Sequence, residues 1–438
     1  MTTGQISEVE PILPPRPRLP RVATGLGFAL RRRQTMTQLT RRYGSTFTIG
    51  LPVFGDVVVV ADPTLARQLF TTSTDRVANI RPNLGRVLGA GSMFSLDGAE
   101  HRRRRKLLTP PLHGKRIRYY EAVVAEEFAA EAVTWPTGRP FATLEPMMRI
   151  TLNVILRTVF GARDADLDVL RQIIPPMVTT GSRLATIPDL PLTFGPLDPR
   201  RRFAAQRETY DRVVGSLIAS ARAEHDLAHR TDILALMILS RHEDGSAMTD
   251  AEIADELLTL LAAGHETTAT TLAWAIERLQ RHRRALDTLV AELDAGGSDY
   301  LTATITEIQR SRPVIDLAGR HVIDDLVELG PYRIPKGHNI MVSISLLHDD
   351  SRQFRDPERF DPERFLGTTP GPAWLPFGGG TRRCIGAAFA QMEMDVVLRA
   401  LIRDFTIEPS TSPDERWHSR GVAYAPARGG RVVLHRRR

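Results

Sequence analysis

Cysteine is almost absent from this 438-residue chain, which has Cys384 alone. One cysteine excludes a disulfide scaffold and every metal site built from several cysteines, and it is typical of a reducing compartment. Long hydrophobic runs are missing too, since no stretch of about 18 apolar residues occurs, so no membrane-spanning helix is expected. The first 20 residues hold prolines and acids but no apolar signal-peptide core. These absences predict a cytoplasmic protein.

Lysine is also scarce, because only three of the 58 basic residues are lysines and the rest are arginines. The net charge of +7 raises the question of a nucleic-acid partner. No zinc-finger spacing, RNA-binding aromatic motif or basic-zipper heptad accompanies the charge, so no nucleic-acid partner is expected. A protein partner with an acidic face explains the charge at least as well.

The patterning predicts a mainly α fold with a smaller β-rich part. Residues 1–20 form a proline-rich leader, and residues 21–438 are expected to form a single domain, without repeats or flexible linkers. Two strands are expected at 46–51 and 57–61, helices from 62 to about 293, and short strands after Gly330. The apolar loops 79–94 and 175–199 are interpreted as lids.

One helix is unusually clear. Thr249 and Glu252 form a capping-box pattern, and the helical pattern continues to about Arg281 without proline. Its middle is apolar on nearly all sides and is therefore expected to be buried. Gly264 and Glu266 follow directly, and both are poor choices for a buried helix. This segment is either a satisfied polar kink or a place where a ligand lies against the helix.

The lone cysteine has a distinctive setting, Phe377-Gly-Gly-Gly-Thr-Arg-Arg-Cys384-Ile-Gly386. A lone cysteine is usually a small buried hydrophobe. Here glycines allow close backbone approach, a following helix can stabilise a thiolate, and Arg382 suits a carboxylate. No neighbouring base supports a nucleophile. As a metal ligand, one thiolate needs a cofactor to supply the remaining ligands, as haem does.

At these residues the sequence resembles a known family, the cytochromes P-450, which are haem-thiolate monooxygenases. The family pattern F-x-x-G-x-R-x-C-x-G is matched by Phe377, Gly380, Arg382, Cys384 and Gly386. The resemblance extends from the strands near Thr46 to the C-terminus.

Two further motifs stand in the family order. Glu307 and Arg310 match the E-x-x-R motif, and Arg364 lies in the P-E-R-F motif downstream. In the family, the three residues form a buried triad that locks the region leading into the cysteine loop.

The resemblance implies a cytochrome P-450 fold with haem between the long central helix and the helix of the cysteine loop. The cofactor would be heme b (iron protoporphyrin IX), with Cys384 as the iron ligand. The resemblance implies that the haem propionates are bound by His101, Arg105, Arg320 and Arg382. Further residues that would contact the cofactor are Phe377, Gly378, Gly386, Ala263 and Gly264.

The long helix carries the segment that the family uses to activate oxygen. Glu266 would feed protons from solvent, and the Thr267 hydroxyl would hold dioxygen and its water. Arg102, Arg103, Arg104 and Lys106 are either a solvated face or part of a positive surface for an electron donor.

The implied activity is monooxygenation, with electrons passing from NAD(P)H through a ferredoxin and its reductase. No nucleotide fingerprint occurs that would make the chain self-sufficient, and a monomer is expected. The alternative is a non-catalytic haem-binding sensor or carrier, which has no need for an acid–alcohol pair.

The substrate pocket is expected between segments that are mostly apolar, which suggests a hydrophobic compound. Asp316 is the odd member, and it either binds a polar or cationic substrate group or faces solvent. The expected lining segments are residues 79–94, 175–199, the helix around Ala263, 314–318 and Ala423-Tyr424.

Overall fold

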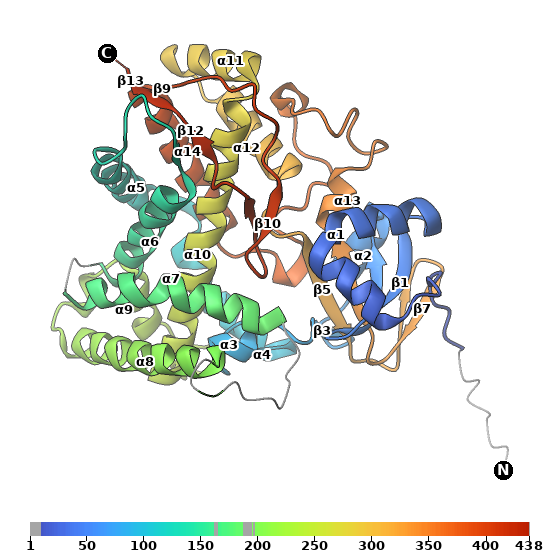
Figure 1. Ribbon diagram of the computed structural model, residues 1–438. Helices are drawn as coiled ribbons and strands as arrows, with labels where there is room; N and C mark the ends of the chain where they lie inside the picture. Colours follow the sequence, from blue (N-terminus) through green and yellow to red (C-terminus); the bar gives the residue numbers. More distant parts are fainter. Residues whose placement is uncertain (1–9, 162–164, 187–194, 196–197, 438) are drawn as a thin grey trace.

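A long helix, α10 (Asp250–Leu279), crosses the middle of the molecule, between a helical part and a sheet (Figure 1). The computed structural model describes residues 10–161, 165–186, 195 and 198–437. Thr249 caps α10 through the backbone N–H of Glu252, and the Glu252 side chain accepts from the Thr249 backbone in return. The capping box predicted from the sequence is therefore confirmed.

Together with α10, the other helices make up about half of the chain, which confirms the mainly α fold. They are α1 (Arg21–Tyr43), α2 (Pro63–Thr71), α3 (Gly85–Leu88), α4 (Gly98–Leu108), α5 (Ile117–Ala132), α6 (Leu144–Phe160), α7 (Ala165–Thr186), α8 (Pro199–Ala223), α9 (Ile233–Leu239), α11 (Arg283–Asp294), α12 (Asp299–Ser311), α13 (Ile344–His348) and α14 (Ala387–Asp404).

Five strands form the main sheet in the order β1-β2-β8-β5-β3, in which only β2 and β8 run parallel. Their valines and isoleucines alternate between two apolar layers, one against α1 and one against α2. The strands are β1 (Thr46–Leu51), β2 (Gly55–Val60), β3 (Val77–Asn79), β5 (Leu317–Val322) and β8 (Asn339–Ser343).

Four small two-stranded sheets complete the β part. These pair β6 (Leu326–Leu329) with β7 (Tyr332–Pro335), β4 (Phe141–Ala142) with β12 (Arg431–Val432), β9 (Phe405–Ile407) with β13 (Leu434–Arg436), and β10 (Trp417–Ser419) with β11 (Tyr424–Pro426).

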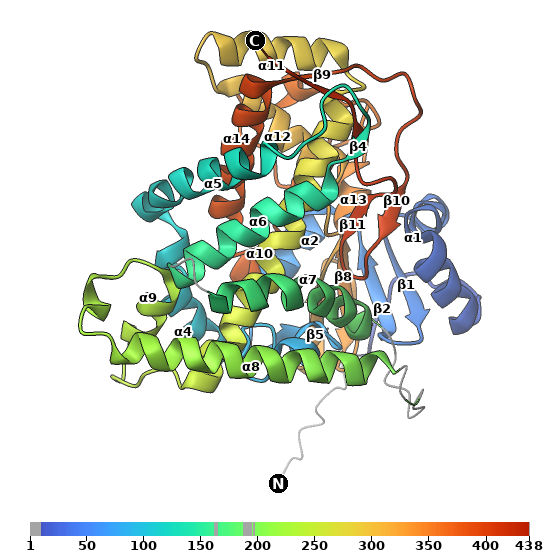
Figure 2. The same ribbon diagram turned by 60° about the vertical axis from the view of Figure 1, so that its left-hand side comes forward.

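The largest apolar core lies where α10 packs against α6 and α14, while α5 packs against those two helices (Figure 2). Trp274 of α10 is fully buried there, and its indole N–H donates to the Tyr424 carbonyl of β11. Gly264 permits a close approach of α6, because a Cβ at this position would lie 3.3 Å from Ile155 Cδ1. The helix pair thus positions the middle of α10 firmly.

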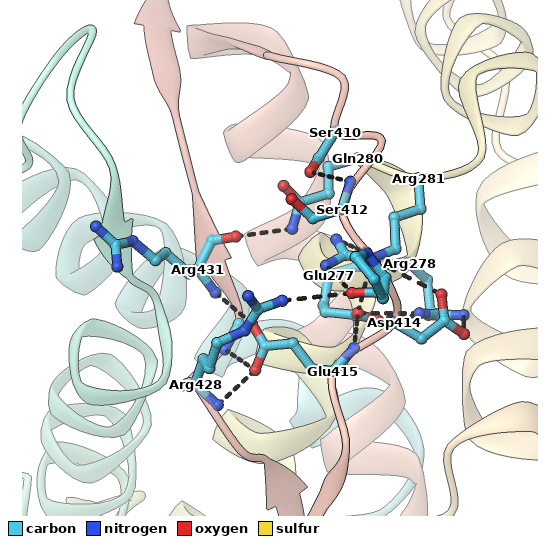
Figure 3. Close-up of polar contacts among 12 residues, drawn as sticks. Glu277, Arg278, Gln280, Arg281, Ser410, Ser412, Asp414, Glu415, Arg428 and Arg431 are labelled. Atoms are coloured by element: carbon cyan, nitrogen blue, oxygen red, sulfur yellow. Dashed lines mark hydrogen bonds and ion pairs between the residues drawn. The ribbon is translucent and has the colours of Figure 1, made fainter.

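The C-terminal segment is tied to the end of α10 by buried charges (Figure 3). Glu277 is fully buried, pairs with Arg278 at 2.5 Å and accepts the backbone N–H of Glu415 at 2.9 Å. The Glu415 carboxylate in turn accepts backbone N–H groups of Arg428 and Arg431. The segment that contains the β10–β11 hairpin therefore starts from a rigid base.

The prediction of a lid loop over 175–199 is wrong in its first half. Pro175 and Pro176 lie inside α7, where the burial of Ile174 and Met177 offsets the hydrogen bonding that proline removes. Residues 187–194 and 196–197 of the predicted loop lie outside the described residues. In the other predicted loop, 79–94, the short helix α3 forms.

Among the described residues, no helix is both long enough and apolar enough to cross a membrane.

Candidate active site

A cavity of about 900 Å³ separates α10 from the cysteine loop. This volume lies near the upper end of what small-molecule sites enclose. All twelve residues that the sequence predicts for the site line it: His101, Arg105, Ala263, Gly264, Glu266, Thr267, Arg320, Phe377, Gly378, Arg382, Cys384 and Gly386.

The cysteine loop folds back on itself so that Cys384 faces the cavity. The backbone N–H of Cys384 donates to the Phe377 carbonyl at 2.9 Å, and Gly386 caps α14 immediately afterwards. Cys384 thus lines the cavity deep within the protein. Burial raises the pKa of the Cys384 thiol, while the Gly386 N–H and the guanidinium groups of Arg105 and Arg383 act in the opposite direction.

Gly380 makes this turn possible. Its φ of +66° lies in the left-handed region, and a Cβ would stand 1.9 Å from the Phe70 carbonyl oxygen of α2. No side chain fits there without moving α2.

Four cationic or titratable groups converge at one end of the cavity. Arg320 donates to the Gly379 carbonyl at 3.1 Å, and Arg382 pairs with Asp97 at 2.5 Å. Burial lowers the pKa of Arg320 to about 10 and also lowers that of Arg382. For His101, burial and then the Arg382 and Arg105 charges lower the pKa to about 3, so its imidazole is neutral at neutral pH.

This cluster fits the anionic side of a haem. Within the described part of the chain, Asp97 is the one carboxylate whose charge acts on His101, Arg320 or Arg382. His101 Nδ1 is buried and has no hydrogen-bond partner among the described residues. Arg105 and Arg320, which pair with no described carboxylate, lie beside an orphaned imidazole nitrogen, and this arrangement is suited to carboxylates such as haem propionates. With one thiol on the cavity wall, the donor set matches a thiolate-ligated haem.

The opposite wall is the middle of α10. Ala263 and Thr267 face the cavity, and the Thr267 hydroxyl donates to the Ala263 carbonyl at 2.8 Å. The helix is continuous here, and the carbonyl of His265 also accepts the Thr151 hydroxyl of α6 at 2.8 Å. Of the two interpretations made from the sequence, the cavity favours the ligand-facing one.

Glu266 on the same wall is nearly buried, with 5% of its surface exposed. Arg420 Nε donates to Glu266 Oε1 at 2.7 Å. Arg420 lies in the turn between β10 and β11, so the C-terminal hairpin reaches back over α10. The carboxylate thus has one partner outside its helix, and that partner carries a full charge.

The predicted buried triad is confirmed. Arg310 pairs with Glu307 through two 2.7 Å hydrogen bonds, and Arg364 Nε lies 3.3 Å from the same carboxylate. Glu307 and Arg310 are both fully buried. His348 links this triad to the cysteine loop, since its Nδ1 lies 3.0 Å from the Arg310 carbonyl and its Nε2 accepts the Leu375 N–H at 3.0 Å.

Each predicted lining segment contributes residues to the cavity, but Asp316 and Tyr424 do not line it. Asp316 is buried and accepts the Ser345 backbone N–H at 3.3 Å, so it neither lines the cavity nor faces solvent. Tyr424 is turned away as well, toward Trp417.

Arg104 corrects the interpretation of the basic run on α4. Its side chain is 4% exposed and pairs with Glu252 at 2.5 Å and Glu256 at 3.0 Å, both on α10. Lys106 and Arg103 pair with Glu243 and Asp244. The run therefore joins α4 to the beginning of α10 more than it presents free positive charge.

Sequence reasoning missed several residues of this site. Arg420 is separated from Glu266 by 154 residues, and α1 contributes Phe28, Ala29 and Arg32 to the cavity wall. Glu393 of α14 is buried beneath α10, and burial raises its pKa to about 8 against the influence of Thr268. The sequence feature that could have identified Glu393 is an acidic residue on the otherwise apolar, buried face of a helix.

Comparisons with known proteins point in one direction. The family model described as cytochrome P450 matches residues 13–429. A putative cytochrome P450 138 of Mycobacterium tuberculosis is 54% identical over 426 residues, covering 97% of both chains. A putative cytochrome P450 135B1 of the same species is 40% identical, covering 96% of this chain and 91% of that one.

Solved structures agree at the level of the fold. A retinoic-acid-bound cyanobacterial CYP120A1 has a TM-score of 0.86 and 23% identity, covering 98% of this chain and all of that one. The heme domain of cytochrome P450DA has a TM-score of 0.86 and 22% identity, covering 98% of each chain.

Proposed function

We propose that this chain, which belongs to the cytochrome P450 family and is a monooxygenase, inserts one oxygen atom of O₂ into a hydrophobic organic substrate. The other oxygen atom would be reduced to water. One observation carries this proposal: a thiol and an acid–alcohol pair, Cys384 and Glu266-Thr267, occupy opposite walls of one cavity.

We propose heme b as the cofactor, with Cys384 as its iron ligand. When bound, haem supplies the redox chemistry that allows dioxygen to be reduced and cleaved. His101, Arg105, Arg320 and Arg382 would hold its propionates, while Phe377, Gly378 and Gly386 would border it on the thiolate side. Ala263 and Gly264 would lie against its other face, where small residues leave room.

Glu266 and Thr267 would deliver protons. Glu266 lies beside the turn of the β10–β11 hairpin, where Arg420 orients its carboxylate, and can exchange protons between that side and the cavity. The Thr267 hydroxyl, held by the Ala263 carbonyl, can pass a proton on while the apolar lining keeps bulk water out.

A hydrophobic substrate is supported by the cavity lining. Val87, Phe94, Val178, Phe203 and Ile315 are among the apolar side chains that line the cavity. Burying the apolar groups of a substrate against these side chains is favourable, and the side chains offer few polar contacts.

Electrons would come from NAD(P)H through a ferredoxin and its reductase. Exposed Arg383 lies next to Cys384 and influences its pKa, so an acidic donor would dock close to the iron ligand. We further propose a monomer that works in the cytoplasm.

The deciding experiment is the absorption spectrum of the reduced, carbon-monoxide-bound protein, with Cys384→Ser as the matched variant. A strongly red-shifted Soret band in the wild type, and its loss in the variant, is expected. A thiolate-type band that persists in Cys384→Ser would contradict the ligand assignment. A sensor or carrier would show the same spectrum but no substrate-dependent NAD(P)H consumption with redox partners.

A further inference from the structure

The outer face of α1 is apolar although it faces solvent. Ten large hydrophobic side chains are exposed in the described part of the chain, and six of them lie between Ile12 and Leu30. Val22, Leu26 and Leu30 are 66%, 56% and 78% exposed. Residues four apart are turned by only about 40° on a helix, so these three form one stripe.

The stripe has nothing polar within it. Ala23 and Ala29 are exposed on its two sides, whereas Thr24 and Phe28, on the opposite face of α1, are buried. A surface helix of a globular protein normally turns its apolar face inward. Here, both faces are apolar, and α1 lies at the edge of the molecule beside β1 (Figure 2).

The chain around the stripe carries mostly positive charge. From Pro11 to Gly55 the sequence has eight arginines and no acidic residue. Arg18 and Arg31 flank the stripe, both are exposed, and neither forms an ion pair with any described residue. Arg16 and Arg21 share Asp56, which lies beyond the segment.

We propose that this face of α1 docks on an anionic lipid bilayer, with Val22, Leu26 and Leu30 among the headgroups and Arg18 and Arg31 on lipid phosphates. An apolar stripe flanked by arginines is the pattern of helices that lie in the membrane interface. An acidic protein would satisfy the arginines, but the stripe lacks the aromatic and methionine side chains in which the cores of protein interfaces are enriched.

The docked orientation has a consequence for the cavity. Phe28, Ala29 and Arg32 of α1 line it, so one wall of the cavity would be held at the lipid surface. A hydrophobic compound dissolved in the bilayer would then meet the protein close to its binding site; this last point rests on the proposed function, whereas lipid docking does not.

The test is co-sedimentation of the haem-loaded full chain with vesicles. We expect binding to vesicles that contain phosphatidylglycerol, weaker binding to pure phosphatidylcholine, and weakening by salt. The variant Val22→Ser/Leu26→Ser/Leu30→Ser should lower partitioning at least about tenfold. Arg18→Gln/Arg31→Gln should lower it by on the order of thirtyfold, since each of the two arginines strengthens binding by about fivefold.

Two controls match these variants. Val133→Ser/Leu239→Ser/Leu366→Ser removes exposed apolar groups elsewhere, and Arg283→Gln/Arg284→Gln removes the same charge from α11. Both should bind vesicles like the wild type. The carbon-monoxide spectrum checks that every variant is folded.

Three outcomes would overturn lipid docking: no vesicle binding by the wild type, equal loss in the control variants, or binding that the stripe variant leaves unchanged. If light scattering instead shows a dimer that the stripe variant dissociates, the face is a contact between two copies. If only electron transfer from an acidic ferredoxin falls, the face belongs to a protein partner.

Discussion

Arg420 and Glu266 join the two parts of the chain that enclose the reaction site. Their 2.7 Å ion pair connects the turn of the C-terminal hairpin to the middle of α10. The Glu266 side chain is 7% exposed and that of Arg420 is 22% exposed, so water screens the pair poorly. Arg420 is therefore a positioning residue for the proposed proton donor, although it lies outside every motif of the family.

Replacing Arg420 tests this role. Arg420→Ala leaves a nearly buried carboxylate without its cation, which costs about 3–5 kcal/mol in comparable pairs, so Glu266 should turn away. We expect product formed per NAD(P)H to fall several-fold and the solvent isotope effect on turnover to change. Arg420→Lys should restore most of the loss. Unchanged coupling in Arg420→Ala would show that the pair serves structure alone.

Thr267 should control the same step from the cavity side. Thr267→Ala removes the hydroxyl that donates to the Ala263 carbonyl, and general acid catalysis contributes about a hundredfold or more. We expect peroxide to replace product, with coupling reduced at least tenfold, while substrate affinity stays the same. Thr267→Ser keeps the hydroxyl and should remain coupled. Equal coupling in the alanine variant would assign the proton transfer to another residue.

The buried triad predicts a defect in cofactor loading. Arg310→Ala removes one partner of a fully buried pair and leaves Glu307 with Arg364 alone, at a cost of about 3–5 kcal/mol. The yield of haem-loaded protein, measured as Soret absorbance relative to protein, should fall sharply. Arg284→Ala, which breaks an exposed pair with Glu363, should cost less than about 1 kcal/mol. A normal holoprotein yield from Arg310→Ala would contradict the proposed locking role.

Gly380 is expected to tolerate no side chain. Gly380→Ala places a Cβ 1.9 Å from the Phe70 carbonyl at a φ of +66°, so the cysteine loop must shift. We predict loss of the thiolate-type carbon-monoxide band in favour of a blue-shifted one. Gly371→Ala, where nothing lies within 4 Å of the new methyl group, should behave like the wild type. An unaltered spectrum in Gly380→Ala would mean that α2 yields instead of the loop.

The lowered pKa of buried His348 makes the free energy of unfolding depend on pH. Burial lowers its pKa from 6.5 to about 3, so between these values the unfolded chain binds a proton that the folded protein does not. The contribution of neutral His348 is complete above pH 6.5 and is lost as the pH falls toward 3. Each pH unit below about 6 should cost about 1.4 kcal/mol.

Urea denaturation followed by tryptophan fluorescence at several pH values measures this effect. His348→Gln should flatten the slope below pH 6.5, whereas His418→Gln, at an exposed position, should keep it. A slope that His348→Gln leaves intact would place the proton uptake on other groups.

Local patterns in the sequence explain which predictions held. The course of α10 follows from a capping box and an uninterrupted helical pattern, and the cysteine loop follows from glycines and spacing. The burial of one residue of the basic run could not be predicted from the sequence, because nothing in five consecutive cations on α4 indicates which one faces α10. Arg104 is the buried one, since only Glu252 and Glu256 on the neighbouring helix select it.

The misassigned lid has a similar cause. Two adjacent prolines favour a loop when local chemistry alone is considered, but α7 retains them because its flanking side chains are buried. Arg420 and α1 were missed for another reason: both meet the cavity through contacts between distant parts of the chain, for which the sequence carries no periodic signal.

The buried carboxylates of Glu277 and Glu415 also bear on how this protein can diversify. They fasten the C-terminal segment at its base (Figure 3), through hydrogen bonds to backbone N–H groups that do not depend on the side chains further along. Val422, which lines the cavity from the hairpin turn, can therefore accept substitutions while the base of the hairpin stays in place. Selection or laboratory evolution for new substrates would find in this turn a site where pocket shape changes at little cost to folding.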